Sequence, residues 1–150
     1  MKKFLSILMV LTMVLSLSVT AFAAENTGSI TITNATIGDS YSLYKIFDAT
    51  YSVDANGNAD AVSYSITAEN QFFSYMFGAD GTTPNTYFVY DAVTGAVIRK
   101  EGTQNGDIIG YLTDMVRSET NSFAAVKSET ATAETLVFDD LPYGYYLIDK

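Results

Sequence analysis

The chain has 150 residues, a formal net charge of −9, no cysteine and no histidine. Without these two residue types it has no Ser-His-Asp triad, no thiolate nucleophile, no disulfide and no zinc site of the usual kind. An acidic surface repels phosphate groups, which argues against nucleic-acid binding and against binding to anionic membranes.

The N-terminus has the three parts of a secretory signal peptide. Lys2 and Lys3 precede an apolar run over residues 4–19, and residues 21–23 read Ala-Phe-Ala. The run is marginal as a transmembrane helix, which needs about 20 apolar residues. We therefore expect residues 1–23 to be a signal peptide, cleaved after its last residue, with no stable membrane insertion afterwards. An N-terminal membrane anchor is the alternative.

The remaining part, residues 24–150, has the composition of one folded domain. It carries all 17 acidic residues but only six of the eight basic ones, which gives a net charge of −11. All 11 tyrosines and seven of the nine phenylalanines lie in it, which argues against disorder. Because an exported domain without disulfides lacks the usual covalent support, its core or another kind of crosslink must hold it together.

The first half of this domain predicts strands and one helix. The segments that alternate polar and apolar residues with period two are 29–33, 41–47 and 62–66. Between the last two, Asn56-Gly57 is a hairpin turn signal. A short helix is expected over residues 68–77, capped by Thr67 and ended by Gly78.

The second half predicts four more strands and a second helix. The expected strands are 87–90, 96–99, 135–138 and 145–148. The helix is expected over residues 107–117, with Asn105 as its cap and with Ile108, Ile109, Leu112, Met115 and Val116 buried. Many short strands and two short helices predict an all-β, antiparallel sandwich with helical inserts. Because the last expected strand is followed only by Asp149 and Lys150, we expect these residues to be part of a longer gene product.

Lys45 is the first residue that could carry chemistry. Period-two alternation places it on one strand face with Tyr41, Leu43 and Phe47, so burial of that face would bury the lysine as well. Burial disfavours the ammonium and can leave a neutral, nucleophilic amine. The alternative, favoured by position alone, is that Lys45 lies near a strand end and extends its charge to water.

Asp149 is the second candidate, at the end of the last expected strand. It shares a predicted face with Tyr145 and Leu147. A buried carboxyl has a raised pKa and can hold a proton, as a general acid must. The alternative is a solvated residue at the end of an edge strand that follows a turn.

Four segments of the chain, in this order, carry a family resemblance. They are Ser29-Ile30-Thr31-Ile32, YSLYKIFD at 41–48, QFFSYMFGADG at 71–81 and LVFDDLPYGYYLID at 136–149. Together they resemble the N-terminal domain of Gram-positive LPxTG-anchored pilins, the SpaA and fimbrial isopeptide-forming family. The last segment is similar to the family's E-box, in outline L-P-x-G-Y-x-L-x-E.

The resemblance implies an immunoglobulin-like β-sandwich of the CnaB/SpaA type, secreted and attached to the cell wall. It also implies other pilin subunits and a pilin-assembling sortase as partners, through regions outside this chain. In that family a buried lysine attacks the side-chain carbonyl of an Asn or Asp on a late strand, and a protonated acid assists. Lys45 matches the lysine and Asp149 the acid, although Asp is one methylene shorter than the family's Glu. The acceptor is expected beyond Lys150.

Three functions are compatible with the sequence. The first, which we expect, is a structural subunit of a pilus or surface adhesin, with self-crosslinking as its only chemistry, no enzymatic turnover and no cofactor. The second is a secreted module that binds a glycan or a host protein through aromatic-rich loops. The third is a hydrolase with paired carboxylates, but Asp139-Asp140 has no second buried acid to pair with. The polar segment 54–60 lacks the calcium-loop spacing and is expected to be a hairpin loop.

Overall fold

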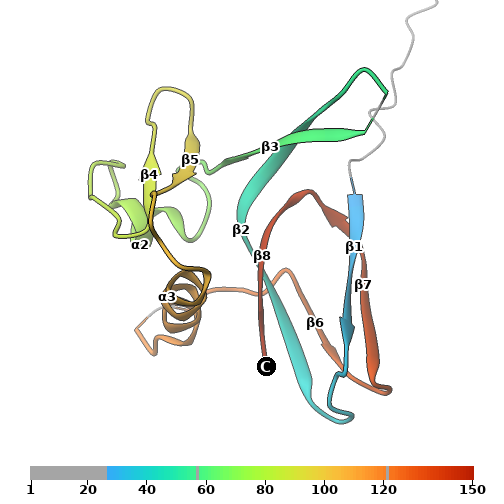
Figure 1. Ribbon diagram of the computed structural model, residues 1–150. Helices are drawn as coiled ribbons and strands as arrows, with labels where there is room; N and C mark the ends of the chain where they lie inside the picture. Colours follow the sequence, from blue (N-terminus) through green and yellow to red (C-terminus); the bar gives the residue numbers. More distant parts are fainter. Residues whose placement is uncertain (1–26, 57, 121) are drawn as a thin grey trace, which may run out of the picture.

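The computed structural model describes residues 27–56, 58–120 and 122–150, so the expected signal peptide, residues 1–23, lies outside the described residues. The elements are β1 (Thr27–Thr33), β2 (Ser40–Val53), β3 (Ala59–Ser65), α2 (Phe73–Phe77), β4 (Phe88–Tyr90), β5 (Ala96–Arg99), α3 (Asn105–Arg117), β6 (Lys127–Thr130), β7 (Thr135–Pro142) and β8 (Gly144–Asp149). In the described residues the chain is mainly β, with antiparallel strands and two short helices, as the sequence predicts (Figure 1). Within this part of the chain, no helix has the length and apolar character needed to cross a membrane.

The long strand β2 joins the parts of the larger sheet. Ser42 pairs with Ser128 of β6 and with Asp149 of β8, so these two strands flank it on opposite edges. Farther along β2, β3 takes the place of β6 and is followed by β5 and β4. The second sheet contains β1 and β7, which lie side by side in Figure 1.

Two separate hydrophobic cores lie on the two faces of β2 and β8. The inter-sheet core, between the two sheets, consists of Ala35, Tyr41, Leu43, Ala131, Leu136, Phe138 and Leu141, with Ile30, Ile32 and Tyr146 packed against it. The helical core, on the side of α2 and α3, consists of Ile46, Phe47, Ile66, Phe72, Phe73, Met76, Phe77, Phe88, Val97, Ile108, Leu112, Met115 and Leu147. Figure 1 shows the helices and the β4–β5 hairpin gathered on that side.

A β-bulge in β2 corrects the predicted face of Phe47. Lys45 pairs with Tyr146 and Phe47 pairs with Tyr145, so Ile46 is an extra residue on β2. After this bulge the alternation is shifted by one residue. Leu43 therefore packs in the inter-sheet core and Phe47 in the helical core, and the prediction of one shared face is wrong for Phe47.

The first helix is shorter than its predicted range of 68–77. α2 begins at Phe73, and its N-cap position, Phe72, makes no side-chain cap hydrogen bond. The predicted cap at Thr67 is therefore wrong. Asn70 instead accepts a hydrogen bond from the backbone N–H of Phe72 at 2.9 Å, forming a local turn that competes with helix.

In α3, the predicted cap and one predicted core residue are wrong. Asn105 is already helical, and Gln104 is the N-cap residue. Ile109 is 53% exposed, because the core-facing stripe of the helix holds Ile108, Leu112 and Met115 instead.

β6 has no counterpart among the strands predicted from the sequence. Its residues are polar, Lys-Ser-Glu-Thr, and show no apolar alternation. Its place is fixed by backbone pairing with β2, as in Tyr41 with Glu129, and by a hydroxyl contact of 2.9 Å between Ser42 and Ser128.

Candidate functional site

The side chain of Lys45 lies across the neighbouring strand β8, and 19% of it is exposed. Its Nζ forms an ion pair of 2.5 Å with the carboxylate of Asp48, whose side chain is 53% exposed. The lysine stem is thus largely covered, while its charge meets a carboxylate at the surface.

Gly144 provides the space that this stem occupies. A β-carbon at position 144 would lie 2.6 Å from Cε of Lys45 and 3.1 Å from its Cγ. Tyr146, directly opposite Lys45, donates a hydrogen bond from its hydroxyl to the carbonyl oxygen of Pro142 at 2.5 Å. Burial raises the pKa of the Tyr146 phenol, and the negative charge of Asp48 adds to the rise.

Asp149 lies on β8 and faces α3. Its Oδ1 accepts a hydrogen bond of 2.8 Å from Nε of Arg117, and the Arg117 Nη2 lies 2.5 Å from the same oxygen. The hydrogen bond and the charge of Asp149 raise the pKa of the Arg117 guanidinium. This ion pair ties the C-terminal end of α3 to β8.

The structure brings the strands of Lys45 and Asp149 together, but not the two side chains. Lys45 is cross-strand partner to Tyr146, which packs against the inter-sheet core, so both point to that face. Asp149 is two residues from Leu147, which packs in the helical core on the opposite face. Each of the two candidate residues has its own ion-pair partner, Asp48 and Arg117 respectively.

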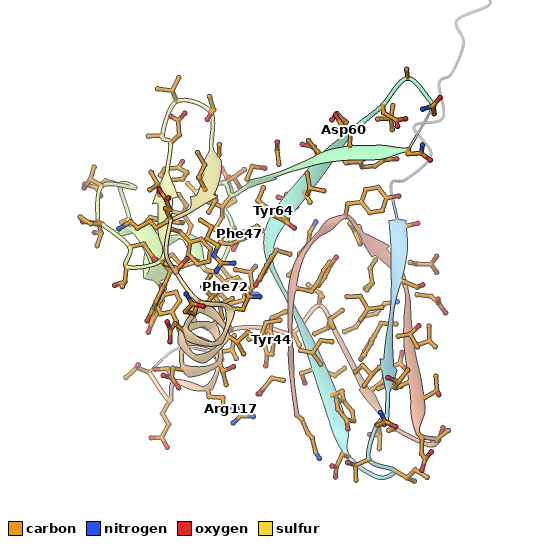
Figure 2. The ribbon with its side chains drawn as sticks, viewed as in Figure 1. Tyr44, Phe47, Asp60, Tyr64, Phe72 and Arg117 are labelled. Atoms are coloured by element: carbon orange, nitrogen blue, oxygen red, sulfur yellow. The ribbon has the colours of Figure 1, made fainter. Side chains whose placement is uncertain are left out.

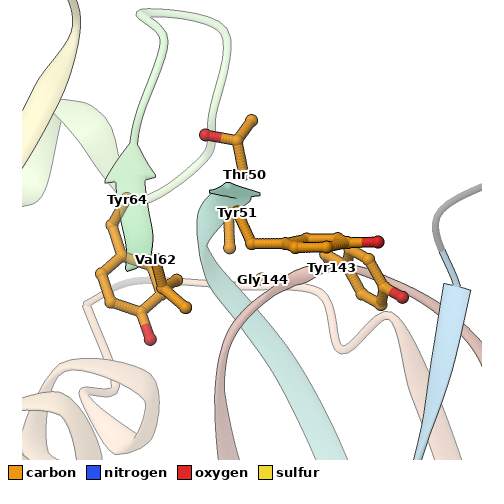
Figure 3. A pocket seen from close by; sticks show the side chains of 7 residues that line it. Thr50, Tyr51, Val62, Tyr64, Tyr143 and Gly144 are labelled. Atoms are coloured by element: carbon orange, nitrogen blue, oxygen red, sulfur yellow. The ribbon is translucent and has the colours of Figure 1, made fainter. Parts of the chain in front are cut away.

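Next to Gly144 lies a surface hollow of about 520 Å³, lined by Ala49, Thr50, Tyr51, Val62, Tyr64, Tyr143 and Gly144. Figure 3 shows the rings of Tyr51 and Tyr143 together on one side and Tyr64 with Val62 on the other. The centroids of the Tyr51 and Tyr143 rings are 5.2 Å apart, in an edge-to-face arrangement. A hydrogen bond with Tyr51, and the negative charge that Tyr51 carries once ionised, raise the pKa of Tyr143.

None of these tyrosines was singled out in the sequence as a site residue. Tyr51 and Val62 are paired across the β2–β3 hairpin, and both remain exposed, by 42% and 54%. The alternation of the two strands predicts that such residues share a face, but period two alone does not reveal that this face lacks a covering layer.

The other acidic positions considered in the sequence have surface roles. Asp139 and Asp140 are both exposed. In the 54–60 segment, one carboxylate oxygen of Asp54 accepts the backbone N–H groups of Asn56 and Asn58, at 2.8 and 2.9 Å. These hydrogen bonds close the turn between β2 and β3, which confirms the predicted hairpin.

Comparison of the chain with protein-family models, with curated proteins and with solved structures found no match. The pilin resemblance therefore stays a prediction, based on the sequence segments quoted above.

Proposed function

We propose that this chain is a structural subunit of a cell-wall-attached pilus or surface adhesin, secreted and without enzymatic turnover. Its fold is proposed to be an immunoglobulin-like sandwich of the CnaB/SpaA type. The observation that carries the proposal is the largely covered Lys45 stem, which lies over Gly144 of the E-box-like segment. A lysine in that place suits a single self-crosslinking reaction that fixes the fold under tension.

The free edge of β8 supports this proposal. Among the described residues, β8 pairs only with β2. Beside it, a hollow of about 220 Å³ lies between residues 28–30 of β1 on one side and residues 141–144 with Tyr146 on the other. An acceptor strand from beyond Lys150, laid along this edge, would face the Lys45 stem across Gly144, the one position of β8 without a side chain.

The proposed reaction joins Lys45 Nζ to the side-chain carbonyl carbon of an Asn or Asp. The C–N bond of Asn or the C–O bond of Asp breaks, and ammonia or water leaves with the proton lost by the amine. Asp149 is the assisting acid implied by the family resemblance. Its carboxyl is paired with Arg117 on the opposite face of β8, so it would have to leave Arg117 and the end of β8 would have to turn before it could reach Lys45. Asp48 is the carboxyl beside Lys45 in this structure, at 2.5 Å.

Intact-mass measurement of the full-length gene product tests the crosslink. The expected mass is lower than the sequence mass by one ammonia or one water, and Lys45→Ala should restore the sequence mass. Lys127→Ala is the matched control, because Lys127 donates to the carbonyl oxygen of Asp139 on the exposed side of β7 and should leave the mass loss intact.

Two further variants identify the assisting acid. If Asp149→Asn abolishes the mass loss and Asp48→Asn does not, Asp149 has the proposed role; the reverse result assigns it to Asp48. A wild-type mass equal to the sequence mass would contradict the crosslink.

Cell-wall fractionation tests the structural role separately, since a subunit of a wall-attached polymer should be released only after digestion of the wall.

A second function, recognition of a glycan or host protein, is favoured by the aromatic hollow of Tyr51, Tyr64 and Tyr143. Exposed tyrosine rings stack on the apolar faces of sugars and offer hydroxyls for hydrogen bonds. Tyr51→Ala should weaken glycan or cell binding, whereas Tyr75→Ala, which removes a similarly exposed ring (43%) on α2, should not. Equal binding by the wild type and both variants would show that this hollow is not the binding site.

A further inference from the structure

A second cavity lies where the larger sheet meets the helical part, and it is separate from the Lys45 site. Its volume is about 370 Å³, within the range of sites that hold small molecules. Its lining residues are Phe47, Tyr64, Phe88, Val97, Arg99, Asn105, Ile108, Ile109 and Tyr145. Figure 2 shows Phe47 and Tyr64 at this junction.

Aromatic rings form much of the cavity wall. The ring of Phe47 lies 5.2 Å from that of Phe88 and 5.9 Å from that of Tyr145. The rings of Tyr64 and Tyr145 meet edge to face at 5.7 Å. Burial raises the pKa of the Tyr145 phenol, and the charge of Arg99 acts in the opposite direction. The wall therefore suits an apolar body rather than a hydrated one.

Arg99 is the cationic group of this cavity. The chain has 17 acidic residues against eight basic ones, yet no carboxylate of the described residues lies within 4.0 Å of this guanidinium. Three hydrogen bonds to neutral groups hold it: Nε to the hydroxyl of Thr103 at 2.8 Å, Nη1 to Asn105 Oδ1 at 2.6 Å, and Nη2 to the Thr103 carbonyl oxygen. A guanidinium has five N–H groups, so two remain for a ligand.

The start of α3 lies at the same cavity. Asn105 is the first residue of this 13-residue helix, and the N-cap residue Gln104 makes no side-chain hydrogen bond to the helix end. The N-terminal end of a helix carries partial positive charge. Asp107 in the first turn offsets part of this charge, so Arg99 is the main group that attracts an anion here.

We propose that this cavity binds a small carboxylate with an aromatic or branched apolar body. The body lies among the rings of Phe47, Tyr64 and Tyr145, and the carboxylate accepts hydrogen bonds from the two remaining N–H groups of Arg99. One guanidinium can donate two parallel hydrogen bonds to the two oxygens of one planar carboxylate. A phosphate dianion has more charge to neutralise, and the cavity lining offers no second basic residue. The proposal goes beyond the structural role and does not depend on the crosslink.

An NMR titration of the secreted chain with 3-phenylpropionate tests the proposal. Saturable shifts are expected at the backbone amides of residues 99–109 and of Tyr145. The neutral isostere 3-phenylpropionamide should bind at least about tenfold more weakly, since it cannot form charge-assisted hydrogen bonds with Arg99. Arg99→Gln should weaken binding of the carboxylate by a similar factor.

Control variants distinguish loss of the Arg99 site from a general change in the protein's charge or from unfolding. Lys150→Gln removes a positive charge from the side chain that pairs with Asp39, and it should leave binding unchanged. Ile109→Glu places an acid at an exposed position of the lining and should weaken binding, whereas Val93→Glu, at a position that is 94% exposed, should not. Absence of saturable shifts in the wild-type chain, equal binding of acid and amide, or unchanged binding by Arg99→Gln and Ile109→Glu would overturn the proposal.

Discussion

Gly144 and Lys45 fit against one another only because residue 144 has no side chain. A β-carbon there would lie 2.6 Å from Lys45 Cε and 2.6 Å from the carbonyl oxygen of Phe47. The backbone oxygen cannot move without disturbing the pairing of β2 with β8. The glycine of the E-box-like segment thus has a steric role in the described structure, whatever chemistry Lys45 carries out.

Gly144→Ala should destabilise the fold by about 1–3 kcal/mol, because the added methyl group forces β8 away from β2. Urea unfolding followed by circular dichroism measures this change. Gly110→Ala is the matched control: nothing lies within 4 Å of its β-carbon position in α3, and the substitution should stabilise the helix by about 1 kcal/mol. Equal effects of the two substitutions would contradict the steric role.

Asn85 is a buried hydrogen-bonding centre, 7% exposed, that connects four backbone or side-chain groups. Its Oδ1 accepts the backbone N–H groups of Tyr87 and Phe88 at 2.9 and 3.1 Å. Its Nδ2 donates to the Met76 carbonyl oxygen at 3.2 Å and to the Tyr111 hydroxyl at 2.9 Å.

Asn85→Ala should therefore destabilise the protein by about 3 kcal/mol, since it leaves buried backbone donors without acceptors. Denaturant unfolding measures the loss. Thr86→Ala truncates a polar side chain at the next, exposed position and should alter stability by less than about 0.5 kcal/mol. A comparable loss in both variants would show that Asn85 has no special role.

Alkaline pH should destabilise the fold through three partly buried tyrosines. Burial raises the pKa of Tyr111, Tyr145 and Tyr146 above the ordinary value of 10.0. Because the folded state holds these protons more tightly than the unfolded state, stability is full below pH 10.0 and falls as the pH rises through the folded-state pKa values. A pH titration followed by phenolate absorbance should show some tyrosines ionising above the ordinary value of 10.0. Tyr145→Phe should reduce the number of these tyrosines. Ionisation of all tyrosines in one step near the ordinary value would contradict this.

Acid should also destabilise the fold, through three carboxyls in turns whose folded-state pKa values are lowered. Hydrogen bonds from neighbouring residues lower the pKa of the Asp54, Asp80 and Asp91 carboxyls, chiefly from Asn58, Thr82 and Thr94 respectively. Their stabilising effect is present above the ordinary value of 3.8 and is lost as the pH falls through the folded-state values. Carbon-detected NMR should give midpoints below 3.8 for all three. Asp91→Asn should remove the contribution of this carboxyl to the loss of folding stability in acid.

Cleavage of residues 1–23 is a further prediction. N-terminal sequencing of the exported protein should begin at Ala24, since residues 21–23 have the small residues that signal peptidase requires. Exported protein that still begins with Met1 would instead support an N-terminal membrane anchor.

Local sequence pattern predicts most of the strands, both helical regions and the mainly β character of the described residues. Alternation marked residues 29–33, 41–47 and 62–66, because successive side chains of a strand point to opposite faces. Apolar spacing marked the second helix, which ends at Arg117 as predicted. Whether a segment forms a strand or a helix depends largely on residues close together in the chain. The local spacing of apolar residues therefore predicts these elements.

The faces and partners of the candidate residues follow from strand pairing and packing between distant parts of the chain. The bulge at Ile46 turned Phe47 to the opposite core, and a core on each face of β2 and β8 separated Lys45 from Asp149. Arg99 and Tyr145 are 46 positions apart in the sequence and line one cavity. Such relationships depend on how strands distant in sequence pair and on which layer covers each face. Local patterns cannot encode them, because a period of two fixes which residues share a face but not what that face meets.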